Sequence, residues 1–423
     1  MNLFLWEKEN KTMMHLSHYS YSVNRAIWKI TRNFHKTCQH LSKSKVVLGI
    51  ETSCDDTGAA VVNTEGQILG EALNSQTKIH VEHGGINPST AKSLHIEQIK
   101  NVVTTALQRA GTTLQDLDAI AVTTEPGLAP CLGIGLGYAK ELVTESGLPM
   151  IPIHHMQAHA LTARLLEHIE FPFLVLLISG GHSILTVAQD VDRFLLIGKG
   201  LDTSPGDCLE KVARCLNLKS LPECQNLSGG AAIEMLAKGG DPKRFAFNAA
   251  QNRVPSCDFS FSGVRTQAET HIQKEREQEG ISGESIISTV GDFCASLQYA
   301  ITFQICRRLQ RAFSYCELQG LLPDNSTLVV SGGVASNQYI RQCLQQVCQM
   351  NSSRLVCPPP KLCTDNGVMI AWNGIEKLRI GRGISSDPQS ENYSPRSPIG
   401  DDVTEELFRL GLKIPRLKLE IQP

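Results

Sequence analysis

The sequence lacks the features that would place it in several large classes of protein. The longest strongly apolar run in its 423 residues, Phe171 to Ile178, contains Pro172 and is far shorter than the roughly 20 residues of a membrane-spanning helix, so we expect no membrane span. The 14 cysteines contain no Cys-x-x-Cys pair, which argues against a disulfide framework or a four-cysteine zinc site. The sequence has no P-loop pattern, and no Gly-x-Gly-x-x-Gly follows the first predicted strand. Nucleotide sites of the P-loop and Rossmann types are therefore disfavoured.

A strong net charge is also missing. The 40 Lys and Arg residues nearly balance the 42 Asp and Glu residues, which leaves a net charge of -2 and no global positive field to attract nucleic acid. Any contact with nucleic acid must therefore be local. With 41% hydrophobic and 19% charged residues, the composition is typical of a compact globular chain of two or three domains.

Acidic residues are absent from Lys11 to Lys45, a segment rich in basic residues and serine. Val23, Ile27, Ile30 and Phe34 recur there at helical spacing, which predicts a basic amphipathic helix. This pattern is typical of mitochondrial targeting segments. We therefore predict that residues 1–45 are a transit peptide and that the protein lies in the mitochondrial matrix. The alternative is a basic extension with no targeting role.

After residue 45 the chain repeats one design. Val46 to Ile50 is an apolar strand, followed by a polar turn and a second apolar run, Ala59 to Val62. Phe173 to Ile178, with a turn and a returning strand at Ser183 to Val187, shows the same order. The repeat indicates two related lobes.

Helical patterns alternate with these strands. Apolar residues recur every three or four positions in Ser93 to Ala110 and in Phe293 to Phe313. A further strand, Ser326 to Val330, precedes a predicted helix that ends near Val347. The alternation predicts an α/β protein, with a surface segment at His271 to Gly280 and another at residues 385–400.

Two histidines stand four residues apart, at His155 and His159. A helix would place both imidazoles on one face, as a divalent metal requires, and Asp365 could add a carboxylate. The metal could be Zn, Fe, Mn or Mg. Alternatively, the histidines are buried without a metal and Asp365 caps a helix. Met156 replaces the glutamate of the His-Glu-x-x-His motif, which removes the general base of a zinc peptidase.

Glycine-rich and acidic turns supply further candidate sites. Ser179-Gly180-Gly181 and Ser331-Gly332-Gly333 each follow an apolar strand, where exposed backbone N–H groups could bind phosphate. Ordinary turn formation explains such pairs equally well. Asp55 and Asp56 lie in the first turn, where they could bind a cation, accept a proton or simply form the turn.

Seven motifs follow one another along the chain. They are Leu48 to Thr57, Pro126-Gly127-Leu128 with Ala139-Lys140, His155 to His159, Ser179 to His182, Phe259 to Gly263, Ser331 to Val334 with Asn337, and Thr364 to Gly367. The chain resembles TsaD-type tRNA threonylcarbamoyltransferases, in which these motifs occur in the same order, from about Val46 to Asn392, and its leader is typical of the mitochondrial branch.

The resemblance implies an actin/Hsp70-like α/β fold of two ribonuclease-H-like lobes with a cleft between them. We assign residues 46–160 to the N-terminal lobe, residues 161–392 to the C-terminal lobe with a helix near 365–382 closing the metal site, and residues 393–423 to a tail. The implied reaction moves a threonylcarbamoyl group from threonylcarbamoyl-AMP, made by a separate synthase, to N6 of adenosine 37. The acceptors are tRNAs that read codons beginning with A, the product is t6A, and AMP is released. A homodimer is a further family expectation.

The resemblance also implies roles for individual residues. It makes His155, His159 and Asp365 the ligands of one divalent metal ion per subunit, and Asp55 our candidate for handling the proton when N6 attacks. The family carries Asp where this chain has Glu210, one methylene longer, which puts nucleotide affinity in question. The implied substrate-binding residues are Leu177, Ile178, Ser179, Gly180, Gly181, Glu210, Gly230, Glu234, Ser336 and Asn337.

Two other functions remain open from the sequence. One is a zinc metallopeptidase, and the other is a nucleotide-binding scaffold resembling chaperones or kinases. If tRNA binds, it needs a local basic patch, and the alternative for these basic residues is a solvated helix face. Our candidates for this patch are Arg307, Arg308, Arg311, Lys377, Arg379 and Arg382.

Overall fold

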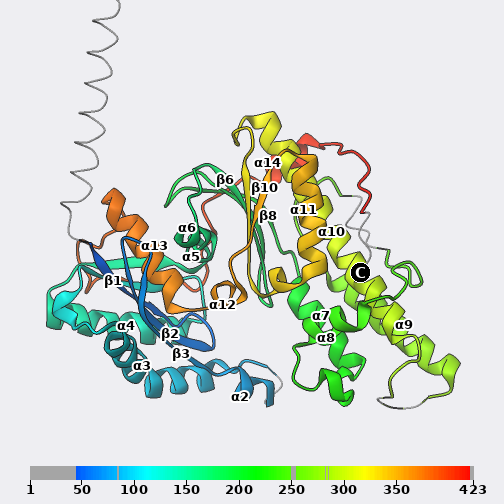
Figure 1. The fold of residues 1–423 in the computed structure, drawn as a ribbon, viewed down its shortest axis with the longest axis horizontal. Coiled ribbons are helices and arrows are strands. Elements are labelled where there is room, and N and C mark those ends of the chain that lie inside the picture. Colours follow the sequence, from blue (N-terminus) through cyan, green and yellow to red (C-terminus); the bar gives the residue numbers. More distant parts are fainter. Residues whose placement is uncertain (1–43, 83–84, 249–253, 282, 284, 420–423) are drawn as a thin grey trace, which may run out of the picture. The chain divides into compact units, whose positions relative to one another are not determined.

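The computed structural model describes residues 44–82, 85–248, 254–281, 283 and 285–419 (Figure 1). The predicted transit peptide lies outside these residues, apart from Ser44 and Lys45. The described residues from Val46 onward form one compact unit.

The first sheet contains five strands in the order β3-β2-β1-β4-β5. Strands β1 to β3 pair antiparallel, whereas β4 lies parallel to β1 and β5 parallel to β4. Most of these strands are β-branched and alanine-rich, and β1, β2 and β4 are almost wholly buried, as expected for a sheet covered on both faces. The strands are β1 (Val46–Glu51), β2 (Asp56–Asn63), β3 (Ile68–Ser75), β4 (Ala119–Glu125) and β5 (Met150–His154).

The second sheet repeats this arrangement. Its order is β10-β9-β6-β7-β8-β11, so the first five strands in chain order occupy the same places as those of the first sheet, with the same parallel and antiparallel pairings. The predicted repeat is therefore confirmed, and the fold is the α/β, actin/Hsp70-like fold of two related lobes. The strands are β6 (Phe173–Ile178), β7 (Ser183–Ala188), β8 (Phe194–Lys199), β9 (Thr327–Ser331), β10 (Arg354–Val356) and β11 (Asp401–Asp402).

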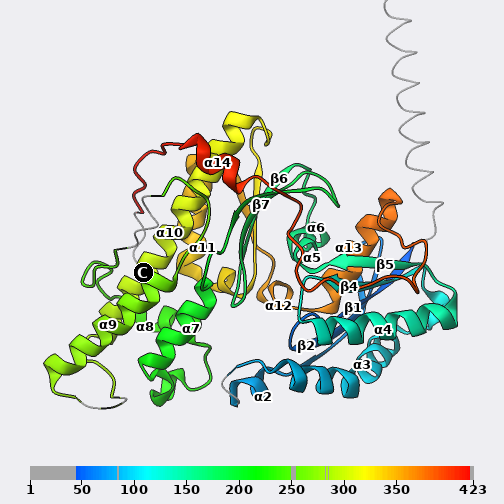
Figure 2. The ribbon, with the colours of Figure 1, turned by 180° about the vertical axis from the view of Figure 1, so that it is seen from behind.

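Helices cover both faces of the first sheet. Leu48 and Ile50 point to one face, where they pack in a cluster with α3 (Pro88–Ala110) and α4 (Ala129–Ser146). Val47 points to the other face and packs against α13 (Gly367–Ile380), because successive side chains of a strand alternate. Figure 2 shows α3 and α4 on the side of the strands away from α13.

Helix α5 (His155–Leu161) lies between the two sheets. Its Ala158 belongs to the apolar cluster of the first sheet and α13, whereas Met156 and Leu161 pack in a cluster with Phe173 of the second sheet. Contacts on both sides fix the position of α5. Both predicted histidines therefore lie on a helix that packs against the two sheets at once.

The largest core cluster covers the opposite face of the second sheet and includes residues of α7 to α11 and α14. These helices are α7 (Pro205–Cys215), α8 (Gly229–Ala237), α9 (Ser262–Glu279), α10 (Val290–Gln319), α11 (Gln338–Met350) and α14 (Thr404–Leu410). The short helices are α2 (Thr77–Glu82), α6 (Ala163–Leu166) and α12 (Pro360–Cys363), with 3-10 turns η1 (Leu114–Asp116), η2 (Leu218–Ser220), η3 (Pro222–Cys224) and η5 (Gly333–Ser336).

Most predicted elements are present, and three differ in detail. The segment predicted as a surface stretch, His271 to Gly280, includes the second half of α9, whose face toward the core carries Val264, Ala268 and Ile272. Helix α13 packs on the first sheet, although its sequence lies within the predicted C-terminal lobe. The predicted tail contains β11, which extends the second sheet beside β8. The lobe boundaries themselves remain a prediction.

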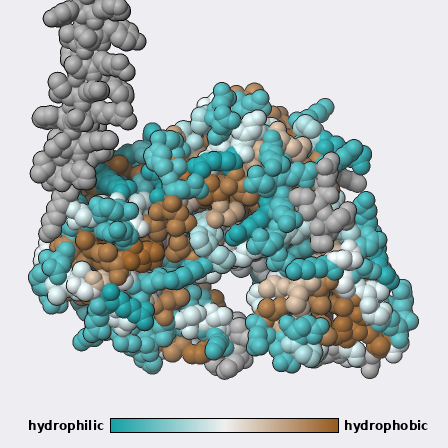
Figure 3. Space-filling model, in the orientation of Figure 1, coloured by the Kyte–Doolittle hydropathy of each residue, from teal (hydrophilic) through white to brown (hydrophobic). Residues whose placement is uncertain are grey.

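In the described part of the chain, no helix combines the length and hydropathy needed to cross a membrane. The face drawn in Figure 3 is a mosaic of hydrophilic and hydrophobic residues. Large exposed apolar side chains are scattered along the chain and include Leu73, Ile96, Leu201 and Leu318. Scattered residues of this kind are normal on a folded chain.

Gly49 sets how closely α13 approaches β1. A Cβ atom at this position would lie 2.2 Å from the backbone nitrogen of Ala371 and 2.4 Å from the carbonyl oxygen of Gly367. We therefore expect Gly49→Ala to lower the free energy of unfolding by about 1–3 kcal/mol, the usual effect of forcing extra volume into a packed site. Urea denaturation of the purified protein measures this change.

Gly137→Ala is the matched control, because a Cβ atom at Gly137 in α4 would meet no atom within 4 Å beyond its chain neighbours and the adjacent backbone of its own helix. Alanine is the better helix former by about 0.5–1 kcal/mol, so this variant is expected to be as stable as the wild type or more so. Equal stability of Gly49→Ala and wild type would contradict the packing described here.

Candidate metal centre

The sequence of α5 brings its two histidines together. His154 precedes the helix and its ring accepts a hydrogen bond from the backbone N–H of Met156, which caps the first turn. His155 and His159 then lie one turn apart on the same face, with ring centroids 4.7 Å apart and planes at 86°. Both side chains are buried.

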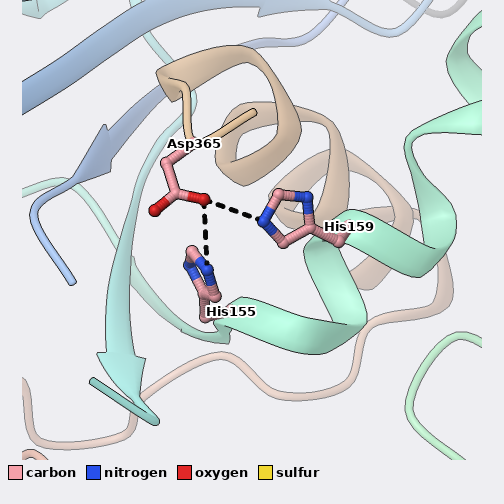
Figure 4. A group of neighbouring side chains, drawn as sticks. All are labelled: His155, His159 and Asp365. Carbon is pink, nitrogen blue, oxygen red and sulfur yellow. Dashed lines mark hydrogen bonds and ion pairs between the residues drawn. The ribbon is translucent and has the colours of Figure 1, made fainter. Parts of the chain in front are cut away.

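Asp365 reaches the same place from a segment more than 200 residues later. Its Oδ1 lies 3.0 Å from Nε2 of His159 and 3.4 Å from Nε2 of His155 (Figure 4). The alternative that Asp365 caps α13 is wrong, because Asn366 is the cap and accepts from the backbone N–H of Met369. The carboxylate of Asp365 is thus directed to the histidines.

These three side chains fit a divalent metal ion. One ligand atom from each lies within 4.8 Å of the others, and two imidazole nitrogens with a carboxylate oxygen suit Zn, Fe or Mn. A cation held by the Nε2 side of both rings and by Asp365 is compatible with these positions.

Glu51 is a site residue that the sequence reasoning missed. It lies at the end of β1 with no exposed surface, and its Oε2 is 3.1 Å from Nδ1 of His155. Thr123 Oγ1 donates to Oε2 at 2.5 Å, and the backbone N–H of Ser53 donates to Oε1 at 2.5 Å. The sequence signal for Glu51 is its place as the first charged residue at the end of a buried apolar strand.

The electrostatics of the centre follow from two carboxylates around one imidazole. Burial disfavours charge on His155, but Glu51 and Asp365 outweigh that effect and raise the pKa of His155 to about 10. Burial also acts to raise the pKa of both carboxyl groups. The charge of His155 outweighs burial, so that the pKa of Glu51 is lowered and that of Asp365 lies well below its usual value.

The predicted phosphate turn lies next to the histidines. The ring of His182, at its end, is 6.5 Å from that of His155. Ser204 Oγ donates to the carbonyl oxygen of Gly180 at 2.6 Å, so the turn is held at the N-terminus of α7, where a helix attracts anions. The predicted binding residues Leu177 and Ile178 are buried within β6, while Ser179, Gly180 and Gly181 are accessible.

The predicted nucleoside residues lie around α7, α8 and α11. Glu210 accepts a hydrogen bond from the backbone N–H of Gly229 at 2.7 Å, beside Gly230. Glu234 accepts from the N–H of Gln338 at 2.6 Å, which places it next to Ser336 and Asn337. Asn337 caps α11 and donates to Gln298. The structure therefore brings Glu210 close to Gly230, and Glu234 close to Ser336 and Asn337. The carboxylate of Glu210, one methylene longer than that of Asp, accepts its hydrogen bond from the protein backbone.

The two aspartates of the first turn differ in environment. Asp56 begins β2, and its Oδ1 is buried without a hydrogen-bond partner in the described ranges. Burial raises the pKa of Asp56 to about 7. Asp55 is not a member of the group of three ligand candidates. The role predicted for Asp55 therefore remains a prediction.

Half of the predicted basic patch is wrong. Arg308, Arg311 and Lys377 are buried, and each donates to backbone carbonyl oxygens, so these three residues offer no surface to a nucleic acid. Helical periodicity could not distinguish a buried arginine from an exposed one. Three of the six candidates keep some exposure, namely Arg307, Arg379 and Arg382.

Comparison with known proteins identifies close relatives. A sequence model of the TsaD family, described as tRNA N6-adenosine threonylcarbamoyltransferase, matches residues 67–372. The chain is 49% identical to the mitochondrial tRNA N6-adenosine threonylcarbamoyltransferase of Mus musculus, over 93% of this chain and 96% of that protein. For the Homo sapiens protein of the same name, the identity is 48% over 94% of this chain and 96% of the relative.

Two solved structures resemble the chain distantly. T. kodakarensis HypF gives a TM-score of 0.46 at 15% identity, covering 82% of this chain and 48% of that one. Component A of (R)-2-hydroxyglutaryl-CoA dehydratase from Acidaminococcus fermentans gives 0.44 at 14% identity, covering 80% of this chain and all of that one. At this degree of similarity neither neighbour informs the function.

We expect one zinc ion to bind per chain and Asp365→Asn to weaken this binding by at least about 100-fold, because the carboxylate oxygen that faces both imidazoles loses its charge. His155→Ala and His159→Ala should each have a comparable effect. Competition with a chromophoric chelator measures the affinities. His168→Ala, at an exposed histidine, is the control and should match the wild type. If Asp365→Asn bound zinc as tightly as the wild type, Asp365 would not be a metal ligand.

Metal affinity should increase with pH. His155, with a pKa of about 10, carries an additional proton at neutral pH in the metal-free protein, and that proton must leave before its Nε2 can bind a cation. Each binding event then releases one proton from His155, so we expect zinc affinity to rise about tenfold per pH unit between about pH 6 and pH 8. Chelator competition in non-coordinating buffers tests this, and a pH-independent affinity would show that His155 is already deprotonated.

Proposed function

The chain belongs to the TsaD family of tRNA N6-adenosine threonylcarbamoyltransferases, and we propose that this transferase moves a threonylcarbamoyl group from threonylcarbamoyl-AMP to N6 of adenosine 37. The tRNAs proposed as acceptors read codons beginning with A, the product is t6A, and AMP is released. The observation that carries the proposal is the convergence of His155, His159 and Asp365 next to the Ser179–Gly181 turn. The family resemblance supports the identities of the substrates.

The proposed reaction needs an activated acyl group, because the exocyclic amine of adenine is a poor nucleophile. The N6–carbon bond forms, the bond between the carbamoyl carbon and the phosphate oxygen breaks, and one proton leaves N6. A divalent ion, when bound by His155, His159 and Asp365, would stabilise negative charge on the oxygens of the acyl phosphate. Asp55 is our candidate for the group that accepts the proton.

The remaining predicted residues would hold the donor. The exposed Ser179–Gly181 turn would bind the acyl phosphate through the backbone N–H of Gly180, assisted by the N-terminus of α7, since the N–H groups of Ser179 and Gly181 already donate within the turn. Glu210, Gly230, Glu234, Ser336 and Asn337 would hold the nucleoside of the donor. Holding both substrates in one orientation can lower the activation barrier by about 7–11 kcal/mol. Precise binding would therefore account for much of the rate enhancement.

The geometry disfavours the peptidase alternative. Met156 follows His155 and is buried, so the general base of the zinc peptidase motif is missing. Glu51 cannot replace it, because Glu51 contacts Nδ1 of His155, whereas Asp365 faces Nε2 on the opposite edge of the ring. Family membership also selects the transferase over a nucleotide-binding scaffold.

We assign the protein to mitochondria, as the names of its relatives in Mus musculus, Homo sapiens and Danio rerio and the basic leader support. The matrix, where mitochondrial tRNA is found, is the proposed location. The proposed partners are tRNA, a separate synthase that supplies the adenylate, and a second copy of the chain. Arg307, Arg379 and Arg382, which keep some exposure, are the proposed contacts for tRNA.

Zinc-loaded protein given threonylcarbamoyl-AMP and unmodified mitochondrial tRNA should form t6A, detectable by mass spectrometry of the nucleosides. We expect Asp55→Asn to lower kcat by about 100-fold or more, the usual contribution of a general base, without changing zinc affinity. Glu405→Gln is the control, because Glu405 is exposed on α14 and pairs only with Arg409 among the described ion pairs, away from the proposed site. Absence of product with the wild type would reject the function, whereas full activity of Asp55→Asn would reject only the role of Asp55.

A further inference from the structure

We propose that Glu51 is a positioning residue for the metal centre, fixing His155 with its proton on Nδ1 so that Nε2 faces Asp365 as a metal ligand. This inference rests on the metal centre proposed above but not on the identity of the substrates. Glu51 would touch neither the metal nor the substrate, and would act only through His155.

The first argument is the complete engagement of the Glu51 carboxylate. Its side chain has no exposed surface. Oε1 accepts from the backbone N–H of Ser53, and Oε2 accepts from Thr123 Oγ1 and lies 3.1 Å from Nδ1 of His155. Among the described residues His155 is the only ion-pair partner recorded for Glu51. A fully buried carboxylate is costly without such partners, so the contact with His155 is a strong one.

The second argument concerns the tautomer of His155. An ionised carboxylate only accepts hydrogen bonds, so the nitrogen beside Glu51 must carry the hydrogen. A neutral imidazole has one N–H, and placing it on Nδ1 leaves the lone pair on Nε2. Nε2 is the atom that lies 3.4 Å from Asp365. Metal-ligating histidines commonly have their second ring nitrogen fixed in this way.

The third argument is the rigidity of the support. Glu51 ends β1, and Thr123 lies on β4, which pairs with β1 in parallel. The carboxylate is therefore held between two neighbouring strands of a buried sheet rather than on a loop. Ser53 Oγ also lies 3.1 Å from Nδ1 of His155 and can accept from the same N–H, which is compatible with the same tautomer.

The two histidines differ in whether their Nδ1 atom has a hydrogen-bond partner. Nδ1 of His159 is buried and has no hydrogen-bond partner in the ranges that the structure describes. Glu51 thus fixes the orientation of His155 through Nδ1, the ring atom opposite its metal-facing edge. His159 is held by packing and by Asp365. An effect of Glu51 on metal binding should therefore pass through His155.

The experiment compares Glu51→Gln with Glu125→Gln. Both substitutions remove one negative charge at the end of a strand of the first sheet, but Glu125 makes no recorded contact with His155. We expect Glu51→Gln to lower zinc affinity by about 10- to 100-fold in chelator competition, and Glu125→Gln to stay within about twofold of the wild type. Thr123→Val should weaken zinc binding in the same direction by a smaller factor. Unchanged affinity in folded Glu51→Gln would overturn the proposal.

A measurement on the wild type keeps the proposal testable even if Glu51→Gln does not fold. Nitrogen-15 NMR of histidine-labelled, zinc-loaded protein should show His155 protonated at Nδ1 and bound through Nε2, whereas the opposite tautomer would overturn the proposal. A wild type that binds no zinc would reject the metal centre together with this inference. Normal zinc binding and the expected tautomer, without any t6A product, would reject the proposed function alone.

Discussion

A series of polar contacts from the buried Glu51 through the buried His155 to the partly buried Asp365 joins three segments that are distant in the sequence. Each end of the series is a carboxylate and the middle is an imidazole, so each charge has an opposite charge next to it, although Asp365 keeps 25% of its side chain exposed. The series exists only if β1, α5 and the start of α13 occupy their observed places. The candidate site is therefore a direct consequence of how these three elements pack.

Close backbone packing sets the position of α13, and with it that of Asp365. A Cβ atom at Gly49, Gly58 or Gly367 would lie less than 3 Å from backbone atoms of the facing element, so the helix approaches the sheet more closely than larger residues would allow. Asn366 caps the helix immediately after Asp365. The same contact that stabilises the first lobe thus delivers a carboxylate to the two histidines.

Patterns of short range were reliable in this chain. The apolar runs predicted the strands, the three- and four-residue periodicity predicted α3 and α10, and the repeated hairpin predicted two related sheets. The basic patch was partly wrong for a specific reason. Arg308 and Arg311 satisfy their charges with backbone carbonyl oxygens inside the core, and nothing in the period of α10 reveals where those oxygens lie. Glu51 was missed because its partners are in β4 and α5.

The sequence alone determined the class of the fold, the pairing of two histidines on one helix face and the resemblance to a tRNA-modifying family, because hydrophobic periodicity and ordered motifs are written along the chain. Tertiary structure alone decided that Asp365 faces the histidines instead of capping α13, that Glu51 contacts His155 from behind, and that two arginines of α10 are buried. Contacts of this kind join residues between 52 and 210 positions apart, and their distances depend on how helices and sheets pack rather than on local propensity.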